Sequence, residues 1–61
     1  MSAWERIESG FYRYRKSTAP ADVLKVGARR WEANYRKNGE RVQKFFKTAS
    51  AAKLHIELTL R

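Results

Sequence analysis

The chain has 61 residues, the size of one small domain, and it contains no cysteine, so neither a disulfide nor a thiolate metal site reinforces it. Fourteen Lys and Arg residues against six Asp and Glu residues give a net charge of +8. No run of about 18 apolar residues that could cross a membrane occurs. The start of the chain lacks the apolar stretch of a secretory signal. We therefore expect a small cytoplasmic protein.

The positive charge is concentrated in the middle of the chain. Residues 10–47 contain eleven basic and three acidic side chains, whereas the two ends together carry three of each sign. A localised field of this kind favours a polyanionic partner, either a nucleic acid or an anionic membrane, over a merely solvated basic surface. The C-terminal segment carries only Lys53 and Arg61 as cations. A membrane partner is therefore not expected.

The chain opens with a polar segment that precedes the first predicted strand. Residues 1–9 are expected to form an N-terminal flap, with Trp4 and Ile7 three residues apart on its apolar side. In residues 10–16 aromatic and arginine side chains alternate. This period of two is typical of a half-exposed strand, so we expect the sheet to begin here.

A segment with Pro20 and Gly27 separates this strand from the next. We expect residues 17–28 to be mainly a loop, with one helical turn around residues 22–25. The second strand is predicted over residues 29–36, where side chains alternate between two faces. The face expected to form the core has Trp31, Ala33 and Tyr35, and the other has Arg30, Glu32, Asn34 and Arg36.

A tight turn is the clearest local signal. Asn38 and Gly39 stand between two alternating runs, and both residue types tolerate the positive φ of a two-residue hairpin turn. The third strand is predicted over residues 40–46 and ends with adjacent Phe45 and Phe46. Neighbouring side chains cannot both face the core of a regular strand. Either a bulge or an outward-facing ring is therefore expected.

The C-terminal residues 48–60 predict a helix. Thr48 is a favourable N-cap, and no glycine or proline follows it. The side chains expected to pack on the sheet recur every four residues, at Ala52, Ile56 and Leu60. Leu54 and Leu58 lie on another side of this helix. The predicted fold is thus a single α+β domain over residues 1–61, with a basic three-stranded antiparallel sheet within residues 10–47 packed against one C-terminal helix.

Catalytic signals are weak. His55 is the single histidine, and no second histidine or cysteine stands at the spacing of a metal site. We expect it at the edge of the core or in solvent. The acidic residues form no acid–base pair on a pocket-forming element, and there is no phosphate-binding glycine-rich loop. We therefore expect a binding protein without cofactor or metal, and not an enzyme.

The expected open face of the sheet carries the side chains that read duplex DNA. The major groove is about 12 Å wide and admits a β-ribbon; guanidinium groups bind guanine, amides bind adenine, and cations bind phosphate. The candidates for the groove are Arg13, Arg15, Arg30, Glu32, Asn34 and Arg36, and those for phosphate are Lys37, Arg41 and Lys44. Alternation alone also fits a solvated strand face, but the excess of arginine favours binding.

Three segments carry a family resemblance: GFYRYR (residues 10–15), RRWEANYRKNG (residues 29–39) and FFKTASAAKLHIEL (residues 45–58). Together they resemble the Arm-type DNA-binding domain of tyrosine integrases and the related DNA-binding domain of plant ethylene-response factors. The resemblance implies a three-stranded sheet that enters the major groove, with the β-strand of residues 29–36 facing the bases.

The chain departs from this pattern in two ways. The loop expected over residues 17–28 is longer than the usual first turn, and we expect no catalytic domain after residue 61. The resemblance therefore implies a free-standing accessory or regulatory factor, encoded by a bacteriophage or another mobile element, and not an integrase.

Two other partners stay open. A protein-interaction module would modulate a host protein through an apolar patch, for which Leu54, Leu58, Trp4 and Phe45 are candidates. Leu54 and Leu58 could also join two copies into a homodimer. A double-stranded RNA binder would instead read duplex shape through its basic residues.

Overall fold

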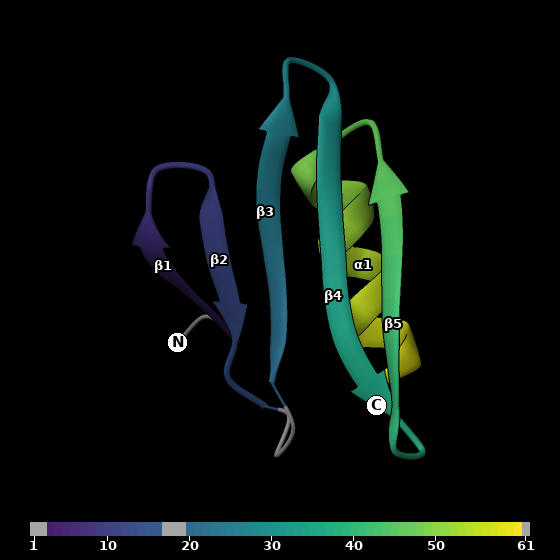
Figure 1. The fold of residues 1–61 in the computed structure, drawn as a ribbon. Coiled ribbons are helices and arrows are strands. Elements are labelled where there is room, and N and C mark those ends of the chain that lie inside the picture. The colour runs from purple at the N-terminus through teal and green to yellow at the C-terminus, as the bar shows by residue number, and fades with distance from the viewer. Residues whose placement is uncertain (1–2, 17–19, 61) are drawn as a thin grey trace.

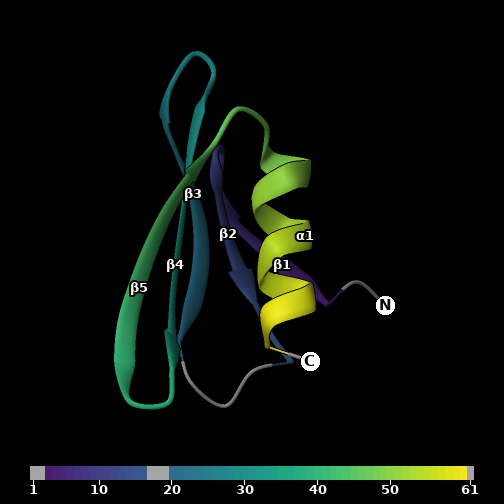
Figure 2. The same ribbon diagram turned by 90° about the vertical axis from the view of Figure 1, so that its right-hand side faces the viewer.

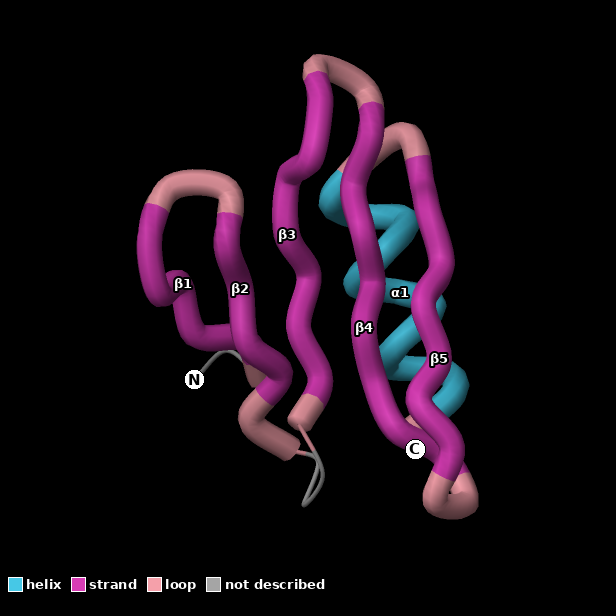
Figure 3. The backbone as a smooth tube through the Cα atoms, viewed as in Figure 1, coloured by secondary structure: helices cyan, strands magenta, loops and turns pink. Residues whose placement is uncertain are grey.

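The computed structural model describes residues 3–16 and 20–60. The elements in chain order are β1 (Trp4–Glu8), β2 (Phe11–Tyr14), β3 (Ala21–Gly27), β4 (Arg30–Lys37), β5 (Glu40–Phe46) and α1 (Ala49–Thr59). The strands form one antiparallel sheet in the order β1-β2-β3-β4-β5, so each strand pairs with its neighbours along the chain (Figure 1; Figure 3). The α+β class with a C-terminal helix is confirmed. The sheet, however, has five strands and not three.

The strand β3 lies in a segment that was predicted to be a loop. The segment 17–28 contains β3, in which Ala21 and Val23 are fully buried. Pro20 comes immediately before this strand, a position where its missing N–H disturbs no ladder hydrogen bond. The prediction of a loop with a helical turn is therefore wrong for residues 21–27. Residues 20 and 28 do lie outside the strand, and residues 17–19 lie outside the described residues.

The predicted N-terminal flap contains the edge strand β1, which pairs with β2. The Trp4 indole Nε1 donates a hydrogen bond of 3.0 Å to Glu57, and the Trp4 ring centroid lies 5.0 Å from that of Tyr14. Lys53 of α1 lies over the Tyr12 ring, 3.6 Å from its centroid. Side chains of α1 thus attach the β1–β2 hairpin. The prediction of a flap is wrong for β1, and residues 1–2 lie outside the described residues.

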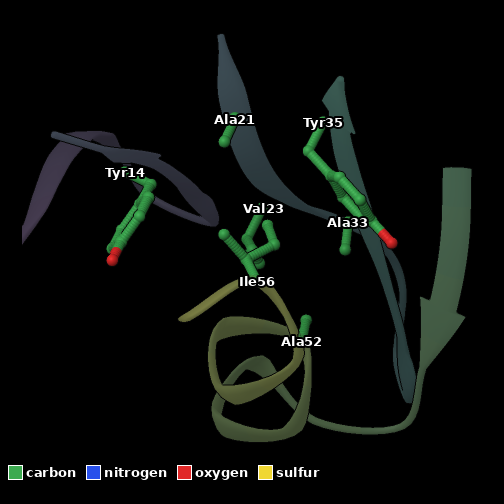
Figure 4. Packing of buried hydrophobic residues seen from close by; sticks show 7 residues of the cluster. All are labelled: Tyr14, Ala21, Val23, Ala33, Tyr35, Ala52 and Ile56. Atoms are coloured by element: carbon green, nitrogen blue, oxygen red, sulfur yellow. The ribbon is translucent and has the colours of Figure 1, made fainter. Parts of the chain in front are cut away.

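The helix α1 covers one face of the sheet over β3, β4 and β5 (Figure 2). The buried core lies between these two layers and consists of Tyr14, Ala21, Val23, Ala33, Tyr35, Ala52 and Ile56 (Figure 4). Trp31 and Leu60 are partly buried against it. The predicted core faces of β4 and α1 are therefore confirmed.

The β4–β5 hairpin follows its local sequence signals. Asn38 and Gly39 form the turn with φ values of 55° and 81°. The strand β5 pairs with β4 without a register shift, so Phe45 and Phe46 point to opposite faces. Phe45 is 47% exposed, whereas Phe46 packs against the core. Of the two predicted arrangements, the outward-facing ring is correct.

The start and the outer side of α1 also agree with the sequence. The Thr48 hydroxyl accepts a hydrogen bond of 3.1 Å from the backbone N–H of Ala51, which is an N-cap. Leu54 and Leu58 are 54% and 57% exposed. They lie on the side of α1 that the sheet does not cover.

Candidate nucleic-acid interface

The face of the sheet opposite α1 is not covered by any element within the described residues (Figure 2). Residues paired directly across antiparallel strands share a face, so the strand register arranges its side chains in rows. We call this surface the open face. Its upper row is Phe11, Leu24, Glu32 and Phe45, its middle row is Arg13, Asp22, Asn34 and Gln43, and its lower row is Arg36 and Arg41.

The open face brings together six of the nine residues predicted to bind DNA. They are Arg13 of β2, Arg30, Glu32, Asn34 and Arg36 of β4, and Arg41 of β5. Lys44 is paired with the core residue Ala33 and therefore lies on the α1 side of the edge strand β5. Lys37 follows Tyr35 by two residues and lies on that same side. Arg15 follows the end of β2.

Most polar side chains of the open face are engaged with one another. The contacts are Arg13 Nε to Asp22 Oδ1 at 3.4 Å, Gln43 Nε2 to Glu32 Oε1, and the Arg30 guanidinium 4.4 Å from the centroid of the Phe45 ring. In each case a cation or donor meets an acidic or aromatic partner on an adjacent strand. Glu32 and Arg30 at the upper end of β4 thus each have a partner on β5.

Three neighbouring side chains are different. Asn34 Oδ1 is buried and has no hydrogen-bond partner. Arg36 and Arg41 are directly paired across β4 and β5, and neither forms an ion pair within the part of the chain that the structure describes. The three line a hollow of about 390 Å³ together with Pro20, Asp22 and Tyr35.

The arrangement of this trio costs stability in the isolated protein. A buried acceptor without a partner lowers the free energy of unfolding by about 1–3 kcal/mol. Like charges directly opposed across a sheet are also unfavourable. A ligand that offers both a donor and negatively charged acceptors would relieve both costs. The trio is therefore the part of the open face that is best prepared for a ligand.

His55 of α1 lies on the opposite side of the sheet from the open face. His55 Nε2 lies 2.8 Å from the Tyr35 hydroxyl, and its ring contacts that of Phe46, so His55 lies at the edge of the core as predicted. Within residues 3–16 and 20–60, no three His, Asp or Glu side chains are grouped to hold a metal ion. In the same residues, no helix has the length and apolarity needed to cross a bilayer.

Two open-face residues of β3, Asp22 and Leu24, were missed by sequence reasoning because their segment was predicted as a loop. The signal was the alternation of the apolar Ala21 and Val23 with Asp22, which fits a strand. Gln43 was missed for another reason. An exposed glutamine on an edge strand has no local feature that indicates its partner, which is Glu32 on the neighbouring strand.

Comparisons of the chain with protein-family models, with curated proteins and with solved structures find no match. The chemistry of the open face is thus the basis for assigning a function.

Proposed function

We propose that the protein binds duplex DNA through the open face, with β3, β4 and β5 lying in the major groove. The observation that carries this proposal is the pair of Arg36 and Arg41. They are directly opposed on an uncovered sheet face, and neither forms an ion pair with a described acidic residue. Guanidinium groups bind phosphate and the O6/N7 edge of guanine with charge-assisted hydrogen bonds. Duplex DNA offers both groups next to each other.

The width of the sheet indicates which strands enter the groove. Neighbouring strands are about 4.8 Å apart, so three strands span about 10 Å and five span about 19 Å. The major groove is about 12 Å wide and therefore admits three strands. The unit of β3, β4, β5 and α1 has the order of elements that the resemblance to Arm-type domains implied, with Ala21–Gly27 in place of residues 10–16 as its first strand.

The charges on the other strands support the same orientation. The edge strand β1 places the carboxylates of Glu5 and Glu8 on the open face, directly paired with Arg13 and Phe11 of β2. Carboxylates are repelled by phosphates, and Arg13 is already engaged with Asp22. The β1–β2 hairpin is therefore expected to stay outside the groove, while the basic β4–β5 side lies against the duplex.

Titration of a labelled duplex of random sequence, followed by fluorescence anisotropy, tests the proposal. With about six phosphates neutralised, the logarithm of the binding constant should fall with the logarithm of salt concentration with a slope of about −5. A duplex that does not bind at low salt, or a flat salt dependence, would contradict the proposal.

A matched pair of variants tests the face. Arg36→Ala/Arg41→Ala removes two charges from the open face of the β4–β5 hairpin, and Lys37→Ala/Lys44→Ala removes two from the α1 side of the same hairpin. If the open face lies in the groove, the loss of affinity should be at least about ten-fold greater for the first variant than for the second. This difference is equivalent to about 1.4 kcal/mol of binding free energy. Equal losses would indicate unoriented electrostatic attraction and contradict the proposed orientation.

Competition with duplex RNA separates the two kinds of duplex. The major groove of A-form RNA is too deep and narrow for protein side chains to read. Duplex RNA is therefore expected to compete weakly with duplex DNA at equal length and salt concentration. Equal competition would contradict reading in the major groove.

A further inference from the structure

Asn34 occupies the middle of the open face, between Asp22 on β3 and Gln43 on β5. Both neighbours are engaged, because Asp22 accepts from Arg13 and Gln43 donates to Glu32. Asn34 Oδ1 is buried without a partner. Asn34 is thus the amide of this row whose hydrogen-bonding capacity is left for a ligand.

An asparagine at this position is unfavourable for the sheet itself. Asparagine is depleted in strands, and a buried acceptor without a donor destabilises the folded state. Native proteins contain few buried polar atoms without a hydrogen-bond partner, and each of these atoms has a specific cause. A ligand that donates a hydrogen bond to Oδ1 supplies one. Arg36 and Arg41 line the same hollow, and their guanidinium groups favour a ligand that also carries acceptors.

The chemistry of the amide selects one base. Its carbonyl accepts and its NH₂ group donates, side by side. In the major groove adenine presents the N6 amino donor next to the N7 acceptor, which complements the amide with two hydrogen bonds. Guanine presents two acceptors, cytosine one donor, and thymine one acceptor beside a methyl group. The Cβ–Cγ torsion of asparagine is soft, so Asn34 Oδ1 can turn outward when a base arrives.

We infer that Asn34 is the base-reading residue of this interface and that it selects adenine, an assignment that rests on the duplex binding proposed above. Arg36 lies two residues along β4, about 6.8 Å away, which corresponds to about two base-pair steps of 3.4 Å. Arg36 and Arg41 therefore contact acceptors within about two base pairs of that adenine, and so fix the register in which Asn34 meets it.

Selection of duplexes from a random pool tests this inference, with wild type compared with Asn34→Ala. Wild type should enrich adenine at one position. Asn34→Ala should keep the salt slope of wild type and lose about 5- to 150-fold of discrimination at that position alone. Gln43→Ala is the matched control, because it removes the neighbouring amide of the same row, and it should retain the adenine preference.

A third variant gives a change that misfolding cannot imitate. The carboxylate of Asn34→Asp only accepts hydrogen bonds and complements the N4 amino group of cytosine. The preferred base at this position should therefore change from adenine to cytosine. An adenine preference that persists in Asn34→Ala, or a wild type without base preference, would overturn the inference and leave duplex binding intact. Loss of all duplex binding by wild type at low salt would instead overturn the proposed function.

Discussion

Arg36 on β4 and Arg41 on β5 are direct cross-strand partners, close to the turn that joins the two strands. Like charges directly opposed across a sheet are destabilising, whereas a pair of opposite charges contributes about 0.2–1 kcal/mol. The isolated protein thus holds two guanidinium groups together at a cost in folding free energy. Stability and ligand binding are therefore expected to change in opposite directions when this pair is altered.

Arg41→Glu should separate these two effects. The substitution places a carboxylate opposite Arg36 and should raise the free energy of unfolding by about 0.2–1 kcal/mol, measured by urea denaturation. Duplex affinity should fall more than ten-fold in the anisotropy titration. Lys44→Glu makes the same change of charge on the α1 side of β5 and should reduce affinity far less. A less stable Arg41→Glu protein with unchanged affinity would contradict the role given to the pair.

Asn34→Thr should make the protein more stable. Threonine favours strands, and the substitution removes the unpartnered Asn34 Oδ1, so a gain of about 1 kcal/mol is expected. In a domain of this size that gain raises Tm by about 4–8 °C, which calorimetry measures. Gln43→Thr is the control. It makes a similar substitution in the same row but breaks the contact with Glu32, so its gain in stability should be smaller. A destabilised Asn34→Thr protein would show that Asn34 is needed for folding.

Tyr35→Phe should cost stability without changing duplex binding. The Tyr35 side chain is 5% exposed, and its hydroxyl is 2.8 Å from His55 Nε2, so loss of this hydrogen bond should cost about 0.5–1.5 kcal/mol in urea denaturation. Tyr14→Phe is the matched control in the same core, because no hydrogen bond of the Tyr14 hydroxyl is found within the described residues. Equal costs for both variants would contradict a structural role for the Tyr35–His55 contact.

Leu54→Glu/Leu58→Glu should leave the fold intact. Both side chains are more than half exposed, and surface substitutions usually change the free energy of unfolding by no more than about 0.5 kcal/mol. Sedimentation at high concentration then tests whether this side of α1 joins two copies, since a dimer should dissociate in the variant. A monomeric wild type at millimolar concentration would exclude the dimer, and an unfolded variant would contradict the exposure of the two leucines.

The second half of the chain could be predicted because its signals are local. Alternation places Trp31, Ala33 and Tyr35 on the core face of β4, and the Asn38-Gly39 turn fixes the register of β5. That register already determines that Arg36 faces Arg41. The sequence does not reveal which polar side chains of the open face are engaged with each other, since this depends on strands that are distant along the chain.

The first half was harder to predict for a physical reason. The edge strand β1 is mostly exposed and has almost no apolar alternation, and a hydrogen bond from Trp4 to Glu57, 53 residues away, helps to hold it. The strand β3 does alternate, but Pro20 and Gly27 at its ends are the residues that usually mark loops. Tertiary pairing, and not local propensity, decides both strands.

The two ends of the described chain meet on the α1 side of the sheet. Ala3 and Leu60 line one hollow of about 430 Å³, together with Tyr14, Lys16 and Glu57, and both pack against the core. A fluorophore or affinity tag at either end would therefore leave the open face unobstructed. A long flexible linker could join the end of one copy to the start of the next and leave both open faces uncovered. Such a tandem protein would present two open faces to one duplex and bind it with the avidity of a bivalent ligand.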